Sequence, residues 1–315
     1  MLSILKSPFR YSRLFLRNKY GALYSAIRSS DTVFAHSITN NIGDLASCPL
    51  HHFPNTFGNG KEVSNQILAR FIQEAGAPKL LDLLDGKPVI FGGGGLIGMD
   101  RHSNHTDVLQ ALSDYALRGG KVVLWGVGHN RISDFETWYS NHQHEPYPAF
   151  FRDFLVGVRD DNLLYNWVPC VSCMSPLFDQ KYDIAHEVAA FLHGDESAGF
   201  LKHLDGIPVH WNLAPNNKND RWAALEAAIQ FLGSAKLIVT NSYHGAYWAS
   251  MLRRSVIAIP NSSKFLSFKH TFPLCPDIAL WQNYRASSSP NRGALSDCRT
   301  ANSAYSLRVA RFLGS

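Results

Sequence analysis

The stretch KLIVTNSYHGAYWASML, residues 236–252, changes from one secondary-structure pattern to another within a few residues. Residues 237–240 form a short apolar run rich in β-branched side chains, which predicts a buried strand, and residues 246–252 predict a helix. The polar segment Asn241-Ser242-Tyr243-His244-Gly245 lies between them. We therefore expect it at the carboxyl end of a strand and the N-terminus of a helix, where backbone amides and the helix dipole favour a phosphate or carboxylate.

The same succession of strand, loop and helix recurs along most of the chain. Near-continuous apolar strands separated by helices predict a parallel sheet with both faces covered. The expected strands are residues 32–36, 88–91, 122–125, 154–158, 207–211, 237–240 and 256–259, and the expected helices are residues 64–75, 106–117, 184–192, 221–232, 246–252 and 304–312. The predicted fold class is α/β, with two Rossmann-like domains that face each other across a cleft and a ligand at the carboxyl ends of both sheets.

The pattern is mixed between residues 170 and 205, and the domain boundary is placed there. We expect a basic N-terminal arm at residues 1–30 and an N-terminal Rossmann-like domain at residues 31–195. A C-terminal Rossmann-like domain follows at residues 196–315 and ends, after a loop at 287–292, in the helix at 304–312.

The composition of the chain is that of a folded protein. Of its 315 residues, 45% are apolar and 17% are charged, which excludes intrinsic disorder and a small disulfide scaffold. The net charge of +5 comes from residues 1–30, which hold six basic residues and no acidic one; the other 285 residues hold 24 basic and 25 acidic residues, a net charge of −1. A body near neutrality lacks the field of a nucleic-acid binder, so we expect no nucleic-acid partner.

Three roles fit the arm at residues 1–30. Lys6, Arg10, Arg13 and Arg17 recur at helical spacing, so the arm can dock on the fold as a helix, contact a membrane surface, or act as an Arg-rich transit peptide without acidic residues. A secretory signal does not fit, because no long apolar run follows the first charges. No 18 consecutive apolar residues occur, which predicts no transmembrane span. We expect a cytoplasmic protein that can contact the inner face of the membrane through this arm.

The odd number of cysteines predicts reduced thiols. The five are Cys48, Cys170, Cys173, Cys275 and Cys298. The motif Cys170-x-x-Cys173 has no second Cys pair at zinc-finger spacing, although a distant Cys48 or His186 could complete a zinc site. We favour packed, non-reactive thiols over a zinc or redox site and expect no metal.

Four consecutive glycines, residues 92–95, follow the expected strand 88–91. Gly93-x-Gly95-x-x-Gly98 satisfies the dinucleotide-binding fingerprint, but the next strand offers no acidic residue before Asp134 to hold a ribose. A glycine-rich turn that shapes the floor of the cleft is the better interpretation. We expect no dinucleotide cofactor.

Three further residues are candidates for chemistry. His244 stands at the strand-to-helix turn, and its unperturbed pKa near neutrality suits proton transfer; the alternative is a structural histidine. Arg159, at the end of strand 154–158, can bind an anion through two hydrogen bonds, with Asp160 orienting it or capping the next helix; the alternative is a surface ion pair. Lys264, just after strand 256–259, is either a second anion ligand or a solvated lysine.

The order and spacing of these motifs resemble the polysaccharide pyruvyltransferase family. The motifs are Asn41-Ile42-Gly43-Asp44, the glycines at 92–95, Gly126-Val127-Gly128, Val158-Arg159-Asp160 and Thr240-Asn241-Ser242-Tyr243-His244-Gly245, which together span residues 33–265. The resemblance implies a glycosyltransferase-like (GT-B-like) fold. It also implies transfer of the pyruvyl group of phosphoenolpyruvate to a pair of sugar hydroxyls of a surface polysaccharide or its lipid-linked precursor, which forms a pyruvate ketal.

The resemblance further implies a role for each residue of these motifs. The donor, phosphoenolpyruvate, would bind on the C-terminal side to Arg159, Asn241, Ser242, Tyr243, His244, Gly245 and Lys264, with His244 and Arg159 catalytic. The glycan acceptor would lie against the N-terminal domain at Asn41, Gly43, Asp44, Gly93, Gly94, Gly95 and His129. Phosphoenolpyruvate is a co-substrate, and neither a cofactor nor a metal is required.

The chain departs from the family pattern in two places. Many members carry an arginine at the position of Ser242, so one anion-binding charge is missing here, and Lys264 can substitute for it. The C-terminal domain also lacks an extra strand and a His/Asp pair of larger relatives. Two other interpretations stay open: a GT-B-like glycosyltransferase with a nucleotide-sugar donor, and a non-catalytic glycan- or membrane-associated scaffold that retains the fold.

Overall fold

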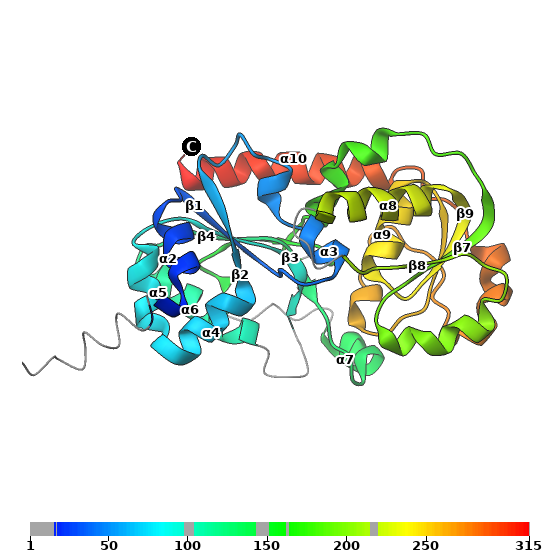
Figure 1. The fold of residues 1–315 in the computed structure, drawn as a ribbon, viewed down its shortest axis with the longest axis horizontal. Helices are drawn as coiled ribbons and strands as arrows, with labels where there is room; N and C mark the ends of the chain where they lie inside the picture. Colours follow the sequence, from blue (N-terminus) through cyan, green and yellow to red (C-terminus); the bar gives the residue numbers. More distant parts are fainter. Residues whose placement is uncertain are drawn as a thin grey trace, which may run out of the picture.

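The structure of the chain is a computed structural model that describes residues 16–314 except 17, 98–103, 143–150, 162–163 and 215–219. It is a mixed α/β fold with two parallel sheets, as the sequence predicts (Figure 1). The first sheet has the strand order β2-β1-β3-β4-β5-β6. Its strands are β1 (Thr32–His36), β2 (Gly60–Ser64), β3 (Val89–Ile97), β4 (Val122–His129), β5 (Leu155–Val158) and β6 (Asn166–Trp167).

The second sheet has the strand order β10-β9-β7-β8, again with parallel pairs throughout. Its strands are β7 (His186–Leu192), β8 (Val209–Trp211), β9 (Ala235–Thr240) and β10 (Ser255–Ala258). Because all pairs in a parallel sheet run the same way, the carboxyl ends of its strands meet at one edge. Each sheet therefore has one edge where the segments after its strands gather.

Helices cover the sheets on both sides. The α-helices are α2 (Gly21–Arg28), α3 (Ile42–Ala46), α4 (Asn65–Ala75), α5 (Ala77–Leu84), α6 (Asn104–Leu117), α7 (Phe135–His142), α8 (Arg221–Gly233), α9 (Tyr243–Met251) and α10 (Ala294–Leu313). Short 3₁₀ helices are η1 (Pro49–His51), η3 (Val171–Met174), η4 (Pro176–Asp179), η5 (Asp195–His203), η7 (Ser263–Phe265) and η8 (Ile278–Ser287).

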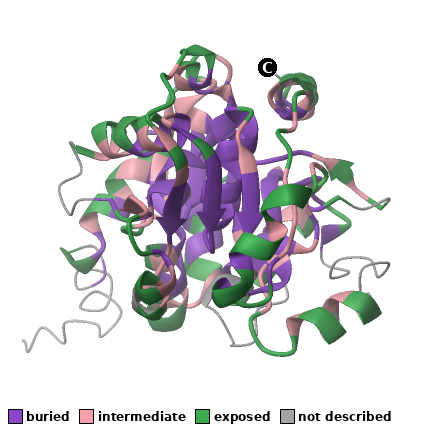
Figure 2. Cartoon of the chain, turned by 90° about the vertical axis from the view of Figure 1, so that its right-hand side faces the viewer, coloured by how far each residue is buried: buried purple, intermediate pink, exposed green. Residues whose placement is uncertain are grey.

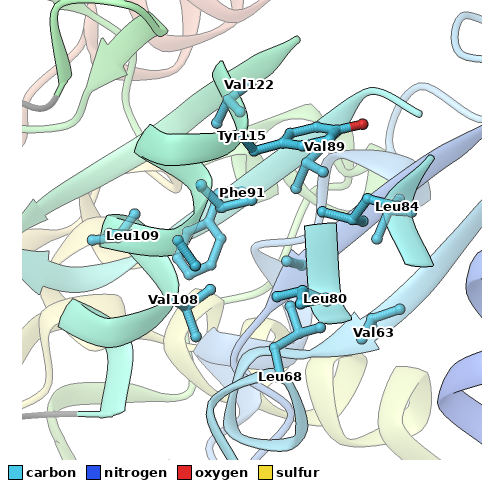
Figure 3. Packing of buried hydrophobic residues seen from close by; sticks show 14 of the residues in the cluster. Val63, Leu68, Leu80, Leu84, Val89, Phe91, Val108, Leu109, Tyr115 and Val122 are labelled. Carbon is cyan, nitrogen blue, oxygen red and sulfur yellow. The ribbon is translucent and has the colours of Figure 1, made fainter. Parts of the chain in front are cut away.

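Alternate residues of the first sheet enter two separate cores, so its central strands are buried on both faces. Val89 and Phe91 of β3 pack with Leu80 and Leu84 of α5 in one core (Figure 3). Ile90, between them, packs on the opposite face of the sheet. Such double burial accounts for the near-continuous apolar strands of the sequence, and the strands at the centre of the molecule are correspondingly buried in Figure 2.

Helix α10 joins the two halves of the molecule along one side (Figure 1). Cys298, in its first half, packs in the core of the second sheet, while Tyr305, in its second half, packs against the first sheet. The Tyr305 hydroxyl donates a hydrogen bond to the carbonyl of Leu124 at 2.8 Å. The predicted helix at 304–312 is too short, because the observed helix α10 begins at Ala294.

One predicted element has the wrong type. Residues 184–192 were expected to form a helix, but His186–Leu192 is strand β7, which lies between β8 and β9. Its last four residues are buried, and a short apolar run of this kind fits a buried strand as well as a helix, so tertiary packing decides. The second sheet thus begins before the boundary placed at residue 195.

The glycines at 92–95 form part of strand β3 and do not form a turn after it. Gly92 pairs with Trp125, Gly94 with Val127 and Gly95 with Gly128 of β4. The edge strand β2 and the two-residue strand β6 were not predicted, because neither contains an apolar run. The remaining predicted strands and helices are confirmed, with ends that differ by a few residues.

The second half of the predicted arm belongs to the fold. Leu16, Tyr20, Leu23 and Ile27 are buried in the core of the first sheet, and the ring of Tyr20 packs edge-on against Phe71, with centroids 5.2 Å apart. The first half, residues 1–15, lies outside the described residues. Within the described part of the chain, no helix is both long and apolar enough to cross a membrane.

Candidate functional site

A pocket of about 250 Å³ is lined by residues from the carboxyl ends of strands of both sheets. The end of β3 and segments that follow β1, β2, β4 and β5 of the first sheet contribute to it, together with segments that follow β7, β8, β9 and β10 of the second sheet. The lining residues are Ser37, Thr39, Asn41, Asp44, Gln66, Gly94, Gly95, Leu96, Asn130, Arg159, His193, Asn212, Ser242, Tyr243, His244 and Lys264. The carboxyl ends of parallel strands are the usual place for ligands in open α/β sheets.

Arg159 is the buried cation of this pocket. It directly follows β5, and its backbone N–H donates to the carbonyl of Val127 at 2.9 Å. Its side chain is 5% exposed, and the guanidinium lies over the ring of Tyr243, with Cζ 3.9 Å from the ring centroid. Among the described residues no carboxylate forms an ion pair with Arg159, and its Nε has no hydrogen-bond partner. A buried, unpaired guanidinium is costly, which fits a group kept to bind an anion.

Two glycines make the room that Arg159 occupies. A Cβ atom at Gly128 would lie 2.7 Å from Arg159 Nε, and one at Gly95 would lie 2.4 Å from Asn130 Cβ and 3.2 Å from Arg159 Nη2. A side chain at either position would therefore displace the guanidinium. Gly92 and Gly93 serve packing instead. A Cβ at Gly92 would lie 2.8 Å from Pro49 Cδ, and one at Gly93 would lie 2.7 Å from Ser47 Cβ, so Gly93, expected to bind the acceptor, contacts the segment after α3.

The carboxylate of Asp160, the neighbour of Arg159, forms its hydrogen bonds with other residues. One carboxylate oxygen accepts the backbone N–H of His129 at 2.9 Å, and the other accepts the hydroxyl of Ser267 at 2.7 Å. The surface ion pair considered for Arg159 and Asp160 is therefore wrong, since both are buried and Asp160 has other partners. His129 itself, expected at the acceptor side, does not line the pocket; its Nδ1 lies 3.2 Å from Ser263 Oγ.

His244 lies in the wall of the pocket and is 4% exposed. Its Nε2 is 3.5 Å from Cys170 Sγ, and a Cβ at Gly43 would lie only 1.9 Å from its Nδ1. Gly43 therefore makes room for the imidazole and does not line the pocket, where it was expected to bind the acceptor. Burial holds the pKa of His244 well below its usual range, and the positive charges of Arg159 and Lys264 add to this effect. The ring is therefore neutral at pH 7, and its pKa lies further from neutrality than the sequence suggested.

The N-terminus of α9 is capped by the chain itself. Ser242 Oγ accepts the backbone N–H of Gly245 at 3.2 Å and the side-chain N–H of Asn212 at 3.0 Å. Asn212 also donates to Asn41 Oδ1 at 3.1 Å, and so joins the two sides of the pocket. Ser242 lines the pocket as predicted, whereas Gly245 packs behind it, where a Cβ would lie 2.4 Å from Thr240 Oγ1.

Asn241 supports the pocket from behind and does not line it. Its side chain accepts the backbone N–H of His193 at 2.8 Å and donates to the carbonyl of His193 at 3.1 Å. His193 lines the pocket, and burial lowers its pKa to about 4, with Lys264 acting in the same direction. Neither His193 nor Asn212 was expected from the sequence. The signal for Asn212 was its place directly after the predicted strand 207–211.

Asp44 and Lys264 complete the charges of the pocket. Asp44 is the one carboxylate among the described lining residues, and Thr39 Oγ1 donates a hydrogen bond to it at 2.9 Å. Burial raises the pKa of Asp44, although the hydrogen bond from Thr39 and the charge of Arg159 act against this rise. Burial and the charge of Arg159 lower the pKa of Lys264 to about 8. The pocket thus combines one permanent cation, one titratable cation, one carboxylate and two neutral histidines, His193 and His244.

Comparisons with known proteins add little to this geometry. No family model and no curated protein matches the chain. Among solved structures, it is similar to an uncharacterized protein of Klebsiella pneumoniae subsp. pneumoniae, with 18% sequence identity and a TM-score of 0.38 over 78% of this chain and 90% of that one. A similarity this distant supports no argument about function.

Proposed function

We propose that the chain is a polysaccharide pyruvyltransferase, in which the two sheets are the centres of two Rossmann-like domains in a GT-B-like arrangement. The donor would be phosphoenolpyruvate, and the acceptor a pair of hydroxyls of a surface polysaccharide or its lipid-linked precursor. The observation that carries this proposal is the buried guanidinium of Arg159, which has no ion-pair partner among the described residues, in a pocket that also holds Lys264. Two cations suit a small ligand with both a phosphate and a carboxylate.

The size of the pocket supports a small donor. Its volume of about 250 Å³ is below the roughly 300–1,000 Å³ of sites for drug-sized ligands. Phosphoenolpyruvate fits such a volume better than a nucleotide sugar, which is several times larger. This observation favours the pyruvyl donor over the glycosyltransferase alternative.

The neutral state of His244 couples donor binding to proton transfer. Two nearby cations, Arg159 and Lys264, contribute to its low pKa. A bound anion would offset both charges and add negative charge beside the ring, so the pKa of His244 would rise when the donor binds. His244 would then take up a proton and deliver it to the methylene carbon of phosphoenolpyruvate.

Asp44 can handle a second proton, because it lines the same pocket from helix α3 while His244 lines it from helix α9. As a carboxylate it would accept the proton of the sugar hydroxyl that attacks C2 of the donor, while C3 gains the proton from His244. The C2–O bond to phosphate then breaks, and phosphate leaves with the bonding electron pair. The second hydroxyl forms the second C2–O bond and passes its proton to the departing phosphate, so that a ketal and inorganic phosphate are the products.

Donor binding tests the proposal directly. We expect phosphoenolpyruvate to raise the thermal unfolding midpoint of the wild-type protein, and incubation with galactosides, glucosides and N-acetylmannosaminides to release phosphate with a mass gain on one sugar. A thermal shift with nucleotide sugars but not with phosphoenolpyruvate would instead support the glycosyltransferase.

The role of His244 separates an enzyme from a scaffold. His244→Ala should abolish phosphate release while phosphoenolpyruvate still shifts the unfolding midpoint, since Arg159 and Lys264 remain. If polysaccharide assembly in cells is unchanged by this substitution, the enzymatic proposal is wrong.

We further propose that the protein acts in the cytoplasm, with residues 1–15 in contact with the inner face of the membrane, where a lipid-linked acceptor would be available.

A further inference from the structure

A second group of chemically reactive side chains lies outside the anion pocket. It consists of His36 at the end of β1, Cys48 just before η1, and Glu62 in β2. One ring nitrogen, the sulfur and one carboxylate oxygen of these residues all lie within 4.8 Å of one another. His36 and Cys48 are fully buried, and Glu62 is half-buried. The parallel pairing of β1 with β2 brings His36 and Glu62 together, and the segment between α3 and η1 adds Cys48.

Hydrogen bonds satisfy only some of the polar atoms of this group. The carboxylate of Glu62 bridges two histidines, with His36 Nε2 at 3.1 Å from Oε2 and His51 Nε2 at 2.8 Å from Oε1. The thiol of Cys48 takes no part in that bridge. Among the described residues, His36 Nδ1 has no hydrogen-bond partner, so the bridge also leaves a buried ring incompletely satisfied.

We propose that His36, Cys48 and Glu62 form a binding site for a divalent metal of the zinc class. Imidazole nitrogen, thiolate and carboxylate are all zinc ligands, with bonds of about 2.0–2.3 Å. Around a tetrahedral ion such bonds place ligand atoms about 3.4–3.6 Å apart, so a group that already spans at most 4.8 Å needs to close by about 1 Å. A dication also balances the two negative charges of a thiolate and a carboxylate in a buried place.

A pocket lined by His51 and Glu62 gives an entry path to this site. The Nε2 of His51 contacts the second carboxylate oxygen of Glu62, and the pocket, of about 180 Å³, lies beside α3. Trp222 also lines this pocket, with its ring edge-on to that of His51 at 5.0 Å between centroids. An ion can therefore reach Glu62 from this pocket, and a water molecule can complete its coordination.

The place of this site in the fold suggests its effect. Cys48 and His51 lie just after α3, the short helix whose first turn carries Asp44 into the anion pocket. A metal would tie this segment to β1 and β2 and so hold α3 in place. The site is distinct from Cys170-x-x-Cys173, where the sequence raised the question of zinc, and it departs from our expectation of no metal.

Metal analysis of the untagged full-length protein tests the proposal. After incubation with Zn²⁺ and extensive dialysis, we expect about one bound Zn²⁺ per chain. Co²⁺ in its place should show a thiolate-to-cobalt charge-transfer band. Cys48→Ser should abolish this band and lower metal affinity at least tenfold, and Glu62→Gln should lower the affinity without abolishing the band. Circular dichroism establishes whether each variant is folded. If Cys48→Ser does not fold, the metal affinity of Glu62→Gln still tests the proposal.

Cys275→Ser is the matched control, because Cys275 is equally buried but lies in the core of the second sheet. It should leave both the band and the stoichiometry unchanged. The proposal is overturned if the wild-type protein retains no metal after dialysis. It is also overturned if the charge-transfer band survives in Cys48→Ser, and a band lost instead in Cys170→Ser or Cys173→Ser would place the metal at the other cysteine motif.

Discussion

The pocket residues that follow strands of the first sheet differ in charge from those that follow strands of the second sheet. Arg159 and Asp44, from the first sheet, are a cation that does not titrate at ordinary pH and a carboxylate. The second sheet contributes His193 and His244, both held neutral by burial, and Lys264, whose pKa is lowered to about 8. The first sheet therefore supplies the one charge of the described pocket that does not titrate, and the second sheet supplies three groups whose pKa values are lowered by burial.

The largest effect should come from Arg159. Arg159→Met removes the permanent cation but keeps much of the volume. We expect kcat/KM for phosphoenolpyruvate to fall about 100- to 1,000-fold, or about 2.7–4 kcal/mol. The thermal unfolding midpoint should stay the same or rise, because a buried unpaired charge has been removed. Steady-state kinetics and calorimetry of the same sample measure both.

Arg159→Lys is the control, since a lysine keeps the charge but loses the two-pronged geometry. It should recover part of the affinity. If Arg159→Met instead lowers the unfolding midpoint by several degrees and retains donor binding, the guanidinium serves stability and the contrast between the two sheets is wrong.

The next effect tests the contact between the two sides of the pocket. Gly43→Ala places a Cβ where it would lie 1.9 Å from Nδ1 of His244. The clash should displace the imidazole, lower kcat about 100-fold and reduce the free energy of unfolding by about 1–3 kcal/mol. Gly199→Ala, with no atom within 4 Å of the added carbon, should change neither quantity. An active Gly43→Ala enzyme would show that the position of His244 does not matter.

A smaller effect is expected from Asn241, which supports the second sheet's side of the pocket through its two hydrogen bonds to His193. Asn241→Ala should cost about 2 kcal/mol of unfolding free energy, from about 1 kcal/mol for each hydrogen bond, and lower kcat/KM about tenfold. Chemical denaturation and kinetics measure these changes, with the exposed Asn55→Ala as the control. If kcat/KM falls more than for Arg159→Met, Asn241 contacts the donor itself.

The pH dependence of donor binding tests Lys264. Because its pKa is about 8 in the free protein, Lys264 loses its charge as the pH rises above that value, and the affinity for an anion falls. We expect KM for phosphoenolpyruvate to rise several-fold between about pH 7 and about pH 9. Lys264→Arg keeps its charge throughout and should flatten the profile. A profile that is the same in both proteins would exclude Lys264 from the donor site.

The smallest effect should follow from removal of residues 1–15. Donor affinity and the unfolding midpoint should not change, because the described pocket and cores begin after this segment. Sedimentation with anionic vesicles should decrease if the segment contacts membranes. Removal of residues 1–30 should instead lower the midpoint by several degrees, since Leu23 and Ile27 leave the core. Equal midpoints for the two truncations would contradict the packing of α2.

Most of the pocket could be predicted from local sequence, because its residues follow apolar runs that are recognisable as strands. Arg159 and the segment Ser242-Tyr243-His244 were found in this way and do line the pocket. His193 was missed for the corresponding reason: the run before it was taken for a helix, so no strand end was expected there. The apolar run of β7 is compatible with both structures, and only its pairing with β8 and β9 decides between them.

The glycines show the limit of motif reading most clearly. Gly93 and Gly95 belong to a dinucleotide-binding fingerprint, yet Gly93 makes room for Ser47 and Gly95 for Asn130 and Arg159. In the same way Gly43 makes room for His244, which lies two hundred residues further along the chain. These contacts join distant segments, so no local pattern predicts them. The group of His36, Cys48 and Glu62 likewise follows no spacing motif, because a parallel strand pair and the segment after α3 bring it together.

The sequence by itself determined that the chain folds as α/β with parallel sheets and that its polar motifs stand at strand ends, since apolar runs and helical periodicity are local properties. It also placed the excess positive charge in residues 1–30. Tertiary structure alone decided which strand-end residues face the pocket and which stand behind it. Tertiary structure also set their protonation. Burial and neighbouring charges shift the pKa values of Asp44, His244 and Lys264, and both come from segments that are far apart in the chain.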